Sequence, residues 1–207
     1  MRKDYAHSKL DRADLTKTPF ELFNTWWNAA LSSGNPEPNM MTLATATIDA
    51  KPSARIVLLK GIEESSFVFY TSYISRKAEE LAKNPQAYLL FFWPEIERQV
   101  RIEGVVRKIS EEKSTEYFQS RPRGSQIGAW VSQQSNPVDS RKTLEERWAE
   151  IESKYVNIEV LPKPSYWGGY QMFPDVFEFW QGRPNRLHDR FQYTRDGEFW
   201  DVERLQP

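Results

Sequence analysis

The sequence contains no cysteine, and two of its 207 residues are histidine. Disulfides and cysteine-ligated zinc sites are therefore excluded, and we expect no metal. The absence of cysteine fits a reducing cytoplasm. No apolar run approaches the roughly 20 residues that span a bilayer, and residues 1–5 lack the apolar segment of a signal peptide. These absences predict a soluble, cytoplasmic protein with no membrane partner.

A large net charge and the common glycine-rich nucleotide motifs are also missing. The 28 Lys and Arg residues are balanced by 29 Asp and Glu residues, which argues against a general nucleic-acid binder. Neither G-x-G-x-x-G nor G-x-x-x-x-G-K-[ST] occurs, so neither a Rossmann dinucleotide site nor a P-loop is indicated. Any anion site must therefore be built from basic residues placed locally.

Local patterns predict strands with interspersed helices. Thr18-Pro19-Phe20-Glu21 indicates a capping box with proline at the first helical position, and the helix should run to about Leu31. Asp196-Gly197 indicates a hairpin turn between strands at 191–194 and 199–202. Other strands are expected at 41–48, 54–59, 66–71, 87–93 and 100–106, and other helices after Ser75 and at 110–119, 125–131 and 144–155.

The same patterns predict which side chains face inward. Ser75 should cap a helix with Ala78, Leu81 and Ala82 on its inner face. Residues 87–93 are almost continuously apolar, which is typical of a strand buried on both faces, whereas 100–106 alternate. Leu144, Trp148, Ile151 and Tyr155 form one helical stripe.

These elements predict a mainly β, α+β fold built on a closed or nearly closed antiparallel barrel. No linker divides the chain, so we expect a single domain over residues 18–207. A mobile N-terminal segment, residues 1–17, should precede it.

Basic residues gather in three segments. Residues 180–190 contain three arginines and one histidine, a second set lies at 55–60, and a third lies at 70–77. Arginine pairs with phosphate or stacks on a ring, and histidine can exchange a proton near neutral pH. If 186–188 is extended, Arg186 and His188 project to one face with Leu187 on the other. The segments favour an anionic, aromatic ligand, and a solvated surface is the alternative for each.

Together with Glu97-Arg98-Gln99-Val100, the segment 120–130 and the segment 165–170, these clusters resemble the pyridoxine (pyridoxamine) 5′-phosphate oxidase family. The resemblance runs from about Arg2 to Pro207. It implies a homodimeric FMN-binding split β-barrel with sites between the two chains. It also implies oxidation of pyridoxamine 5′-phosphate and pyridoxine 5′-phosphate to pyridoxal 5′-phosphate, with dioxygen reduced to hydrogen peroxide.

The resemblance also implies roles for individual residues, with Arg55, Arg76 and Lys77 holding the FMN phosphate and Gln134, Trp180 and Arg190 reaching the cofactor from the partner chain. The implied cofactor-binding residues are Arg55, Lys60, Tyr70, Thr71, Ser75, Arg76, Lys77, Gln99, Gln134, Ser135, Trp180 and Arg190. The implied substrate-binding residues are Lys60, Tyr117, Arg121, Ser125, Arg186, His188, Arg2 and Tyr5. Arg186 and His188 are the implied catalytic residues, and we expect both to orient the substrate ring more than to move its proton.

Several alternatives remain open. Tyr117 can be a core aromatic, Arg121 can close a helix C-terminus, and Gln134 can be an ordinary loop residue. At the level of function, the rivals are a split-barrel flavin oxidase acting on another aromatic acid, such as a phenazine precursor, and a carrier that binds flavin or pyridoxal phosphate without producing peroxide.

Overall fold

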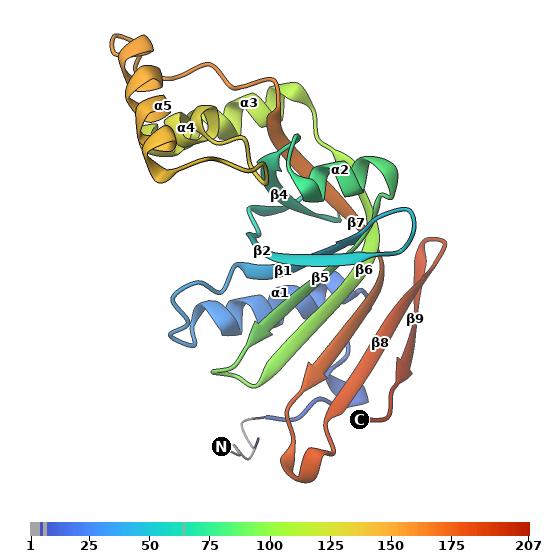
Figure 1. Ribbon diagram of the computed structural model, residues 1–207. Helices are drawn as coiled ribbons and strands as arrows, with labels where there is room; N and C mark the ends of the chain where they lie inside the picture. The colour runs from blue at the N-terminus through green and yellow to red at the C-terminus, as the bar shows by residue number, and fades with distance from the viewer. Residues whose placement is uncertain (1–4, 6–7, 64) are drawn as a thin grey trace.

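The computed structural model describes residues 5, 8–63 and 65–207. Within this part of the chain, nine strands form one antiparallel sheet that curls around a core, with one helix packed on that core and three others grouped at one end (Figure 1). The strands are β1 (Met40–Ala46), β2 (Pro52–Leu58), β3 (Gly61–Glu63), β4 (Ser66–Ser72), β5 (Gln86–Trp93), β6 (Arg98–Lys108), β7 (Trp167–Gln181), β8 (Asp189–Asp196) and β9 (Phe199–Arg204). The α-helices are α1 (Pro19–Leu31), α2 (Arg76–Lys83), α3 (Glu111–Ser120), α4 (Arg123–Val131) and α5 (Arg141–Lys154).

The strand order is β2-β1-β5-β6-β7-β4-β3, with β8 added to β7 and β9 to β8. β7 is the longest strand and serves two partners along one edge. Its first part, 167–172, pairs with β4, whereas its last part, 176–181, pairs with β8. The α+β fold with a curled antiparallel sheet therefore agrees with the sequence prediction.

The first helix forms as its capping residues predict. The Thr18 hydroxyl accepts from the Glu21 N–H and the Glu21 carboxylate accepts from the Thr18 N–H, which completes the capping box before Pro19. Its inner face buries Leu22, Phe23, Trp26 and Ala30 against the sheet. There Phe23 makes edge contacts with Phe67 and Phe91, with ring centroids 4.9 and 5.2 Å apart. Aromatic residues thus fill much of the main core.

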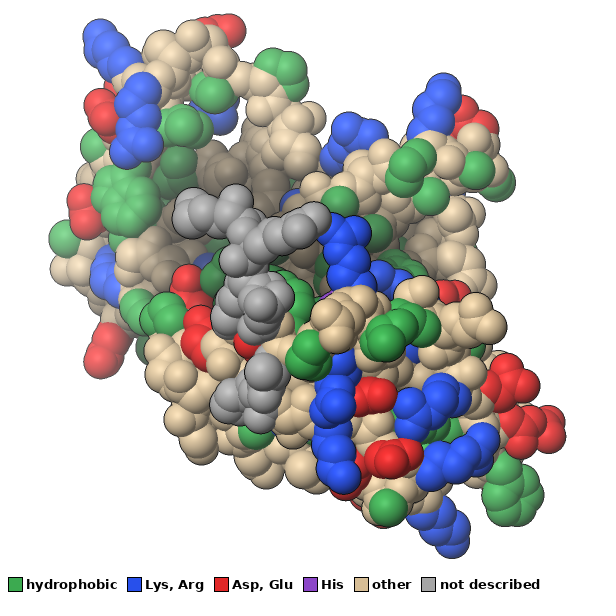
Figure 2. All heavy atoms as spheres, turned by 90° about the horizontal axis from the view of Figure 1, so that it is seen from below, with side chains coloured by type: hydrophobic (Ala, Val, Ile, Leu, Met, Phe, Trp, Pro, Cys, Tyr) green, Lys and Arg blue, Asp and Glu red, His purple; other side chains and the backbone are tan. Residues whose placement is uncertain are grey.

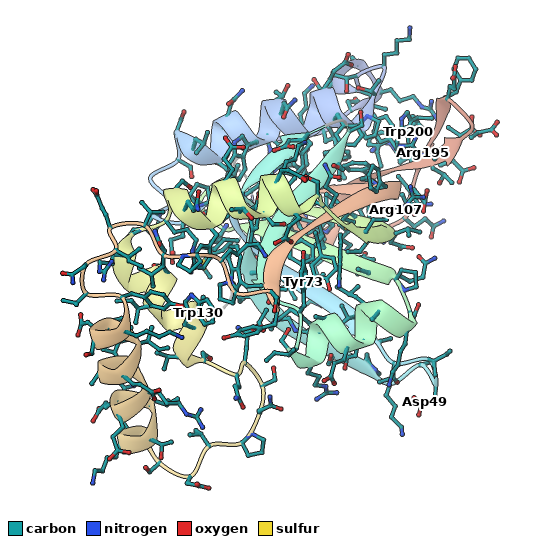
Figure 3. All side chains as sticks on the ribbon, turned by 90° about the horizontal axis from the view of Figure 1, so that it is seen from above. Asp49, Tyr73, Arg107, Trp130, Arg195 and Trp200 are labelled. Atoms are coloured by element: carbon teal, nitrogen blue, oxygen red, sulfur yellow. The ribbon has the colours of Figure 1, made fainter. Side chains whose placement is uncertain are left out.

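A second, smaller core lies beneath α3, α4 and α5, which form a helical lobe at one end of the sheet (Figures 1 and 3). It contains Phe118, Ile127, Leu161 and Trp167. Trp130 lies within this lobe, and Tyr73 marks its border with the sheet (Figure 3). In the described part of the chain, no helix is long and apolar enough to cross a membrane.

The burial of the strands confirms one prediction and corrects another. Residues 100, 102, 104 and 106 of β6 are buried in alternation, as predicted. β5 is not buried on both faces, because its burial alternates and Phe92 is 48% exposed. An antiparallel sheet packs one face on its core, so a continuous apolar run does not require two buried faces.

Three local details also differ from the predictions. Ser75 occupies the N-cap position of α2, but its hydroxyl donates to the Ser72 carbonyl (2.7 Å) rather than capping the helix. Ala82 and Trp148 are exposed rather than buried on the inner faces of α2 and α5. The β8–β9 turn lies one residue later than predicted, since Asp196 still pairs with Phe199 and the two loop residues are Gly197 and Glu198.

The segment 183–188 is not extended, so the predicted alternation of Arg186 and His188 about Leu187 is wrong. Residues 184–186 form a short 3-10 turn in which Asn185 and Arg186 have left-handed backbones (φ 57° and 63°). Pro184 fixes its own backbone angle, and asparagine accepts the left-handed region more readily than most residues, so the chain turns here.

Part of the predicted N-terminal segment packs on the domain. Leu10 is buried in the main core, and Thr16 exchanges two hydrogen bonds with the Tyr193 hydroxyl (3.1 and 3.2 Å). The mobility of residues 1–17 and the domain boundary after residue 17 stay predictions.

Candidate functional site

A cavity of about 960 Å³ lies between β2, β4 and the helical lobe. It brings together many of the residues that the sequence singles out. The predicted site residues on its wall are Arg55, Lys60, Tyr70, Thr71, Arg76, Lys77, Tyr117, Arg121, Ser125, Gln134 and Ser135. They come from four separate segments of the chain, so the fold alone assembles them.

One group of cations lies where α2 begins. Lys77 is buried and donates to the Thr71 hydroxyl (3.1 Å), the Ser75 hydroxyl (3.2 Å) and the Gln134 amide oxygen (2.8 Å). Arg55 and Arg76 line the same end of the cavity. A helix N-terminus adds unpaired N–H groups to this positive region, which is the arrangement that proteins use for phosphate.

Burial acts on the charge of Lys77. Desolvation, with a smaller contribution from nearby Arg55, lowers the Lys77 pKa to about 8, although Glu80 opposes this shift. A dianion in the cavity would favour the protonated amine and reverse part of the shift.

Glu80 is a member of this group that the sequence reasoning missed. Its side chain is 4% exposed and accepts from the Thr45 hydroxyl (2.5 Å), the Ser53 hydroxyl (2.6 Å) and Arg76 Nε (2.9 Å). Burial disfavours the carboxylate, but these donors outweigh it and hold the Glu80 pKa at about 2. A Glu within a basic helix offers no sequence signal beyond its spacing of four residues from Arg76.

A second basic group lies on the lobe side of the cavity. Arg121, at the end of α3, stacks over the Trp167 ring with its guanidinium carbon 4.7 Å from the ring centroid. Its Nη1 is the one buried side-chain nitrogen or oxygen among the described residues that lacks a hydrogen-bond partner. Lys60, Tyr117 and Ser125 line the cavity with it. A buried donor without an acceptor is costly, and an anionic ligand that supplied an acceptor here would remove that cost.

Stacked rings support this second group. Tyr70 and Tyr117 stack with centroids 3.7 Å apart, and Trp167 stacks on Tyr70 at 5.5 Å. Burial, assisted by nearby Glu63, raises the Tyr70 pKa to about 12, so its hydroxyl stays a donor. Trp167 was also missed by the sequence reasoning, because a lone tryptophan before two glycines is equally typical of a core residue.

A further set of predicted residues lies at the opposite end of β7, namely Tyr5, Gln99, Trp180, Arg186, His188 and Arg190. Tyr5, Trp180 and His188 form one aromatic contact group, in which the Trp180 and His188 rings lie 4.6 Å apart and the Tyr5 ring lies 5.7 Å from Trp180. Gln99 and Arg190 pair with Trp180 across the sheet. From Trp167 to Trp180 the strand spans roughly 40 Å, at about 3.3 Å per residue. Within one chain this group therefore lies at the other end of the strand from Trp167 and the cavity.

Charges at this far end are locally paired. Arg190 Nε donates to Glu178 (2.8 Å), and Asp189 pairs with Arg183 (3.5 Å) and Arg204 (3.0 Å). Lys and Arg side chains accordingly lie among Asp and Glu side chains on the face seen in Figure 2. Arg186 is exposed. Arg2 lies outside the described residues.

His188 accepts a hydrogen bond at Nδ1 from the Arg183 N–H (3.1 Å). Burial, reinforced by Arg186 and opposed by Asp189, lowers the His188 pKa below its usual range. The imidazole is therefore neutral at pH 7, with Nδ1 as acceptor and the proton on Nε2.

Two family models cover most of the chain. Residues 29–155 match the model described as pyridoxamine 5′-phosphate oxidase, and residues 167–207 match the pyridoxine 5′-phosphate oxidase C-terminal dimerisation region. The chain belongs to the pyridoxamine 5′-phosphate oxidase family. The resemblance drawn from the sequence is confirmed.

Named relatives are similar over the full chain. Proteins called pyridoxine/pyridoxamine 5′-phosphate oxidase are 53% identical over 210 residues in Burkholderia lata and 54% identical over 208 residues in Paraburkholderia phymatum. In both, the match covers 100% of this chain and 97% of the relative.

Solved structures agree on the fold. PhzG from Burkholderia lata, in complex with tetrahydrophenazine-1-carboxylic acid, matches with a TM-score of 0.89 and 31% identity over 94% of this chain and 95% of that chain. A pyridoxamine 5′-phosphate oxidase-related, FMN binding protein from Nostoc punctiforme matches with a TM-score of 0.70 and 17% identity over 92% of this chain and 98% of that chain. The predicted FMN-binding split barrel is therefore the fold of this oxidoreductase family member.

Gln134 lies in the cavity of its own chain, where its amide oxygen accepts hydrogen bonds from Thr71 (2.9 Å) and Lys77 (2.8 Å). Its contribution to the cofactor from the partner chain stays a prediction. The loop after α4 returns to the cavity of its own barrel, so Gln134 and Ser135 belong with the cations there.

Proposed function

We propose that this protein binds FMN and oxidises pyridoxamine 5′-phosphate and pyridoxine 5′-phosphate to pyridoxal 5′-phosphate, reducing dioxygen to hydrogen peroxide. The observation that carries the proposal is the buried Arg121 Nη1, which lacks a partner in a cavity whose other end already holds three cations. Two separate positive regions in one cavity suit two phosphates, one on a cofactor and one on a substrate.

The residues present fit FMN. Arg55, Arg76 and Lys77 would hold its phosphate, with Thr71 and Ser75 beside them. When bound, the flavin supplies the hydride-accepting ring and the route by which electrons reach dioxygen. The chain's own contribution is placement and charge.

Arg121, Lys60, Tyr117 and Ser125 would hold the substrate phosphate. Trp167 holds the Arg121 guanidinium over its ring, and a guanidinium binds an anion through directed N–H groups as well as through its charge. A phosphate ester offers several oxygens to such donors, so it satisfies Nη1 and its neighbours together.

A homodimer would complete the site. Trp180, Arg190 and His188 lie a full strand away from the cavity of their own chain, and residues 167–207 match a dimerisation region. A symmetric dimer lets the far end of β7 in one protomer face the cavity of its partner. Gln99, Tyr5 and Arg186 would join the site by the same route.

His188 would orient the substrate ring rather than remove a proton. Its Nδ1 already accepts from Arg183, and its Nε2 carries the proton in the neutral ring. Nε2 can therefore donate to the substrate but cannot accept from it in this state. Exposed Arg186 would supply a planar cation against the pyridine ring.

One experiment tests this proposal directly. Protein reconstituted with FMN is mixed anaerobically with pyridoxine 5′-phosphate, and flavin bleaching is followed by stopped flow, with pyridoxal phosphate and peroxide measured after admission of air. We expect bleaching with the phosphate ester and little with unphosphorylated pyridoxine. Arg121→Ala should weaken the ester about tenfold or more and leave FMN bound, because it removes charge-assisted hydrogen bonds from the substrate end alone. Equal bleaching by pyridoxine and its phosphate would contradict the proposal.

A second candidate is oxidation of a polycyclic aromatic acid. The similarity to PhzG, whose structure contains tetrahydrophenazine-1-carboxylic acid, favours it. A single carboxylate would leave much of the lobe-side cation group unpaired, so the phosphate ester is the better match. In the same stopped-flow assay, faster bleaching by a dihydrophenazine carboxylate than by either vitamer phosphate would reverse this ranking.

A further inference from the structure

The cations at the start of α2 depend on a carboxylate that faces them from the same helix. Glu80 Oε1 pairs with Arg76 Nε at 2.9 Å, and Glu80 Oε2 lies 3.6 Å from Arg55 Nη2. One buried side chain therefore contacts both guanidinium groups of the cofactor end of the cavity.

Two hydroxyl groups connect Glu80 more tightly to Arg55. Thr45 and Ser53 each donate to Glu80 Oε2, at 2.5 and 2.6 Å. The same hydroxyl oxygens accept from Arg55, at 2.6 Å for Thr45 and 2.5 Å for Ser53. A hydroxyl has a single proton, so pointing it at the carboxylate leaves its lone pairs for the guanidinium. Glu80 thus orients both hydroxyl groups, and their orientation determines where their lone pairs accept hydrogen bonds from Arg55.

Glu80 also determines the charge that this end of the cavity presents. Arg55, Arg76 and Lys77 carry three positive charges, and the ionised Glu80 leaves a net of two. That balance equals the charge of a phosphate monoester above its second pKa of about 6. A cluster of three bare cations would repel its own members, whereas the carboxylate holds two of them in fixed positions.

We propose that Glu80 is a positioning residue for the phosphate end of the cofactor site, acting through Thr45 and Ser53 on Arg55 and directly on Arg76. This inference rests on the proposed binding of FMN at that end. Removal of the carboxylate leaves Arg55 anchored by the Leu43 carbonyl (3.0 Å) and by two hydroxyls that are free to rotate, and it frees Arg76. The loss of fixed geometry outweighs the gain from one less negative charge, because a guanidinium binds phosphate through directed N–H groups.

The test compares two flavins with the same ring. Full-length protein freed of flavin is titrated with FMN and with riboflavin, which lacks the phosphate, and binding is followed by quenching of flavin fluorescence. The variants are Glu80→Ala and Glu80→Gln, with Glu79→Gln as the matched control, since Glu79 is the exposed neighbour on the same helix. Thermal melting of each variant accompanies the titration.

We expect Glu80→Ala to bind FMN about tenfold or more weakly, with riboflavin changed less than about twofold. Glu80→Gln should lie between wild type and Glu80→Ala because it keeps one acceptor oxygen, and Glu79→Gln should match wild type. If Glu80→Ala does not fold, the Glu80→Gln titration decides alone. FMN binding in the folded variants that equals or exceeds wild type would overturn the inference, as would an equal loss for both flavins. A wild-type protein that does not prefer FMN to riboflavin would instead count against the proposed function.

Discussion

Lys77 holds its charge in a buried position, and this should make the proposed binding of FMN sensitive to alkaline pH. The Lys77 amine has a pKa of about 8 in the folded chain, whereas the ordinary value is 10.5. Its charged neighbours are Arg55, which lowers the pKa, and Glu80, which raises it. Below pH 8 the amine is protonated and can pair with a phosphate. As pH rises through 8 the amine loses its proton and the attraction falls.

We therefore predict that the affinity for FMN declines about tenfold between pH 7 and pH 9, since a group with a pKa of 8 is about one-tenth protonated at pH 9. Fluorescence titration at several pH values measures this. Lys77→Arg keeps its charge and serves as the control with a flatter profile. A wild-type profile as flat as that of Lys77→Arg would show that the amine does not pair with the phosphate.

Arg186 and His188 provide a prediction that separates substrate handling from flavin binding. Both lie on the aromatic end of the molecule and away from the cation groups, so replacing either with alanine should leave FMN bound. Arg186→Ala should weaken substrate binding and slow flavin bleaching together. His188→Ala should be milder, because its Nδ1 is engaged by the Arg183 N–H. A loss of about a hundredfold or more in His188→Ala would instead indicate general-base catalysis.

At the scale of the elements, the backbone of β7 comes so close to Gly104 of β6 that only glycine fits there. The register between β6 and β7 shifts at Glu103 and Gly104, and a Cβ built on Gly104 would lie 2.1 Å from the Phe173 carbonyl oxygen. Backbone atoms form that contact, so they cannot move aside as a flexible side chain can.

Gly104→Ala should therefore destabilise the protein by about 2 kcal/mol, measured by urea denaturation. Gly61→Ala in β3 is the control, because its Cβ would contact only Glu63 side-chain atoms, at 3.7 Å or more. Equal stability of the two variants would mean that the β6–β7 bulge relaxes freely.

Local signals predicted some elements well and failed at others for identifiable reasons. α1 begins and ends as predicted because the Thr18-Pro19-Phe20-Glu21 cap and the Phe23 stripe act within one helix. The turn at Pro184 and Asn185 was mistaken for a strand because alternation of large and basic residues outweighed the turn residues. The contact between Glu80 and Arg55 joins segments 25 residues apart, and only the fold brings them together.

The candidate site shows the same division. The cavity residues were predicted through motif resemblance, and the structure places them around one cavity, while their binding roles stay predictions. The resemblance assigned Trp180 and Arg190 to the partner chain, but no local sequence pattern showed how far from the cavity of their own chain they lie. That separation follows from β7 being a single 15-residue strand, which keeps its two ends far apart.

At the scale of the whole molecule, the cavity and the aromatic group with Trp180 lie at opposite ends of β7. This separation predicts that two inactive variants can complement each other in a mixed dimer. Lys77→Ala damages the cavity, and Arg190→Ala damages the far end. In a mixed dimer one site receives both changes and the other receives neither. Because half of randomly paired dimers are mixed, about a quarter of all sites should be intact.

The measurement is oxidase activity after the two variants are unfolded, mixed and refolded together. A mixture of Lys77→Ala with Arg55→Ala is the control, since both changes lie in the cavity and no pairing can restore a site. Activity in the first mixture that stays at the level of the control would mean that each site is built from one chain.

The continuity of β7 also limits where the chain can change in length. One residue inserted within β7 would turn every later side chain to the opposite face and displace its end by about 3.3 Å. The same insertion in the 47–51 turn or in the 132–140 loop would alter no strand register. The number of residues between Trp167 and Trp180 is therefore as much a requirement of this protein as their identities, and natural insertions and deletions should accumulate in the loops and avoid this strand.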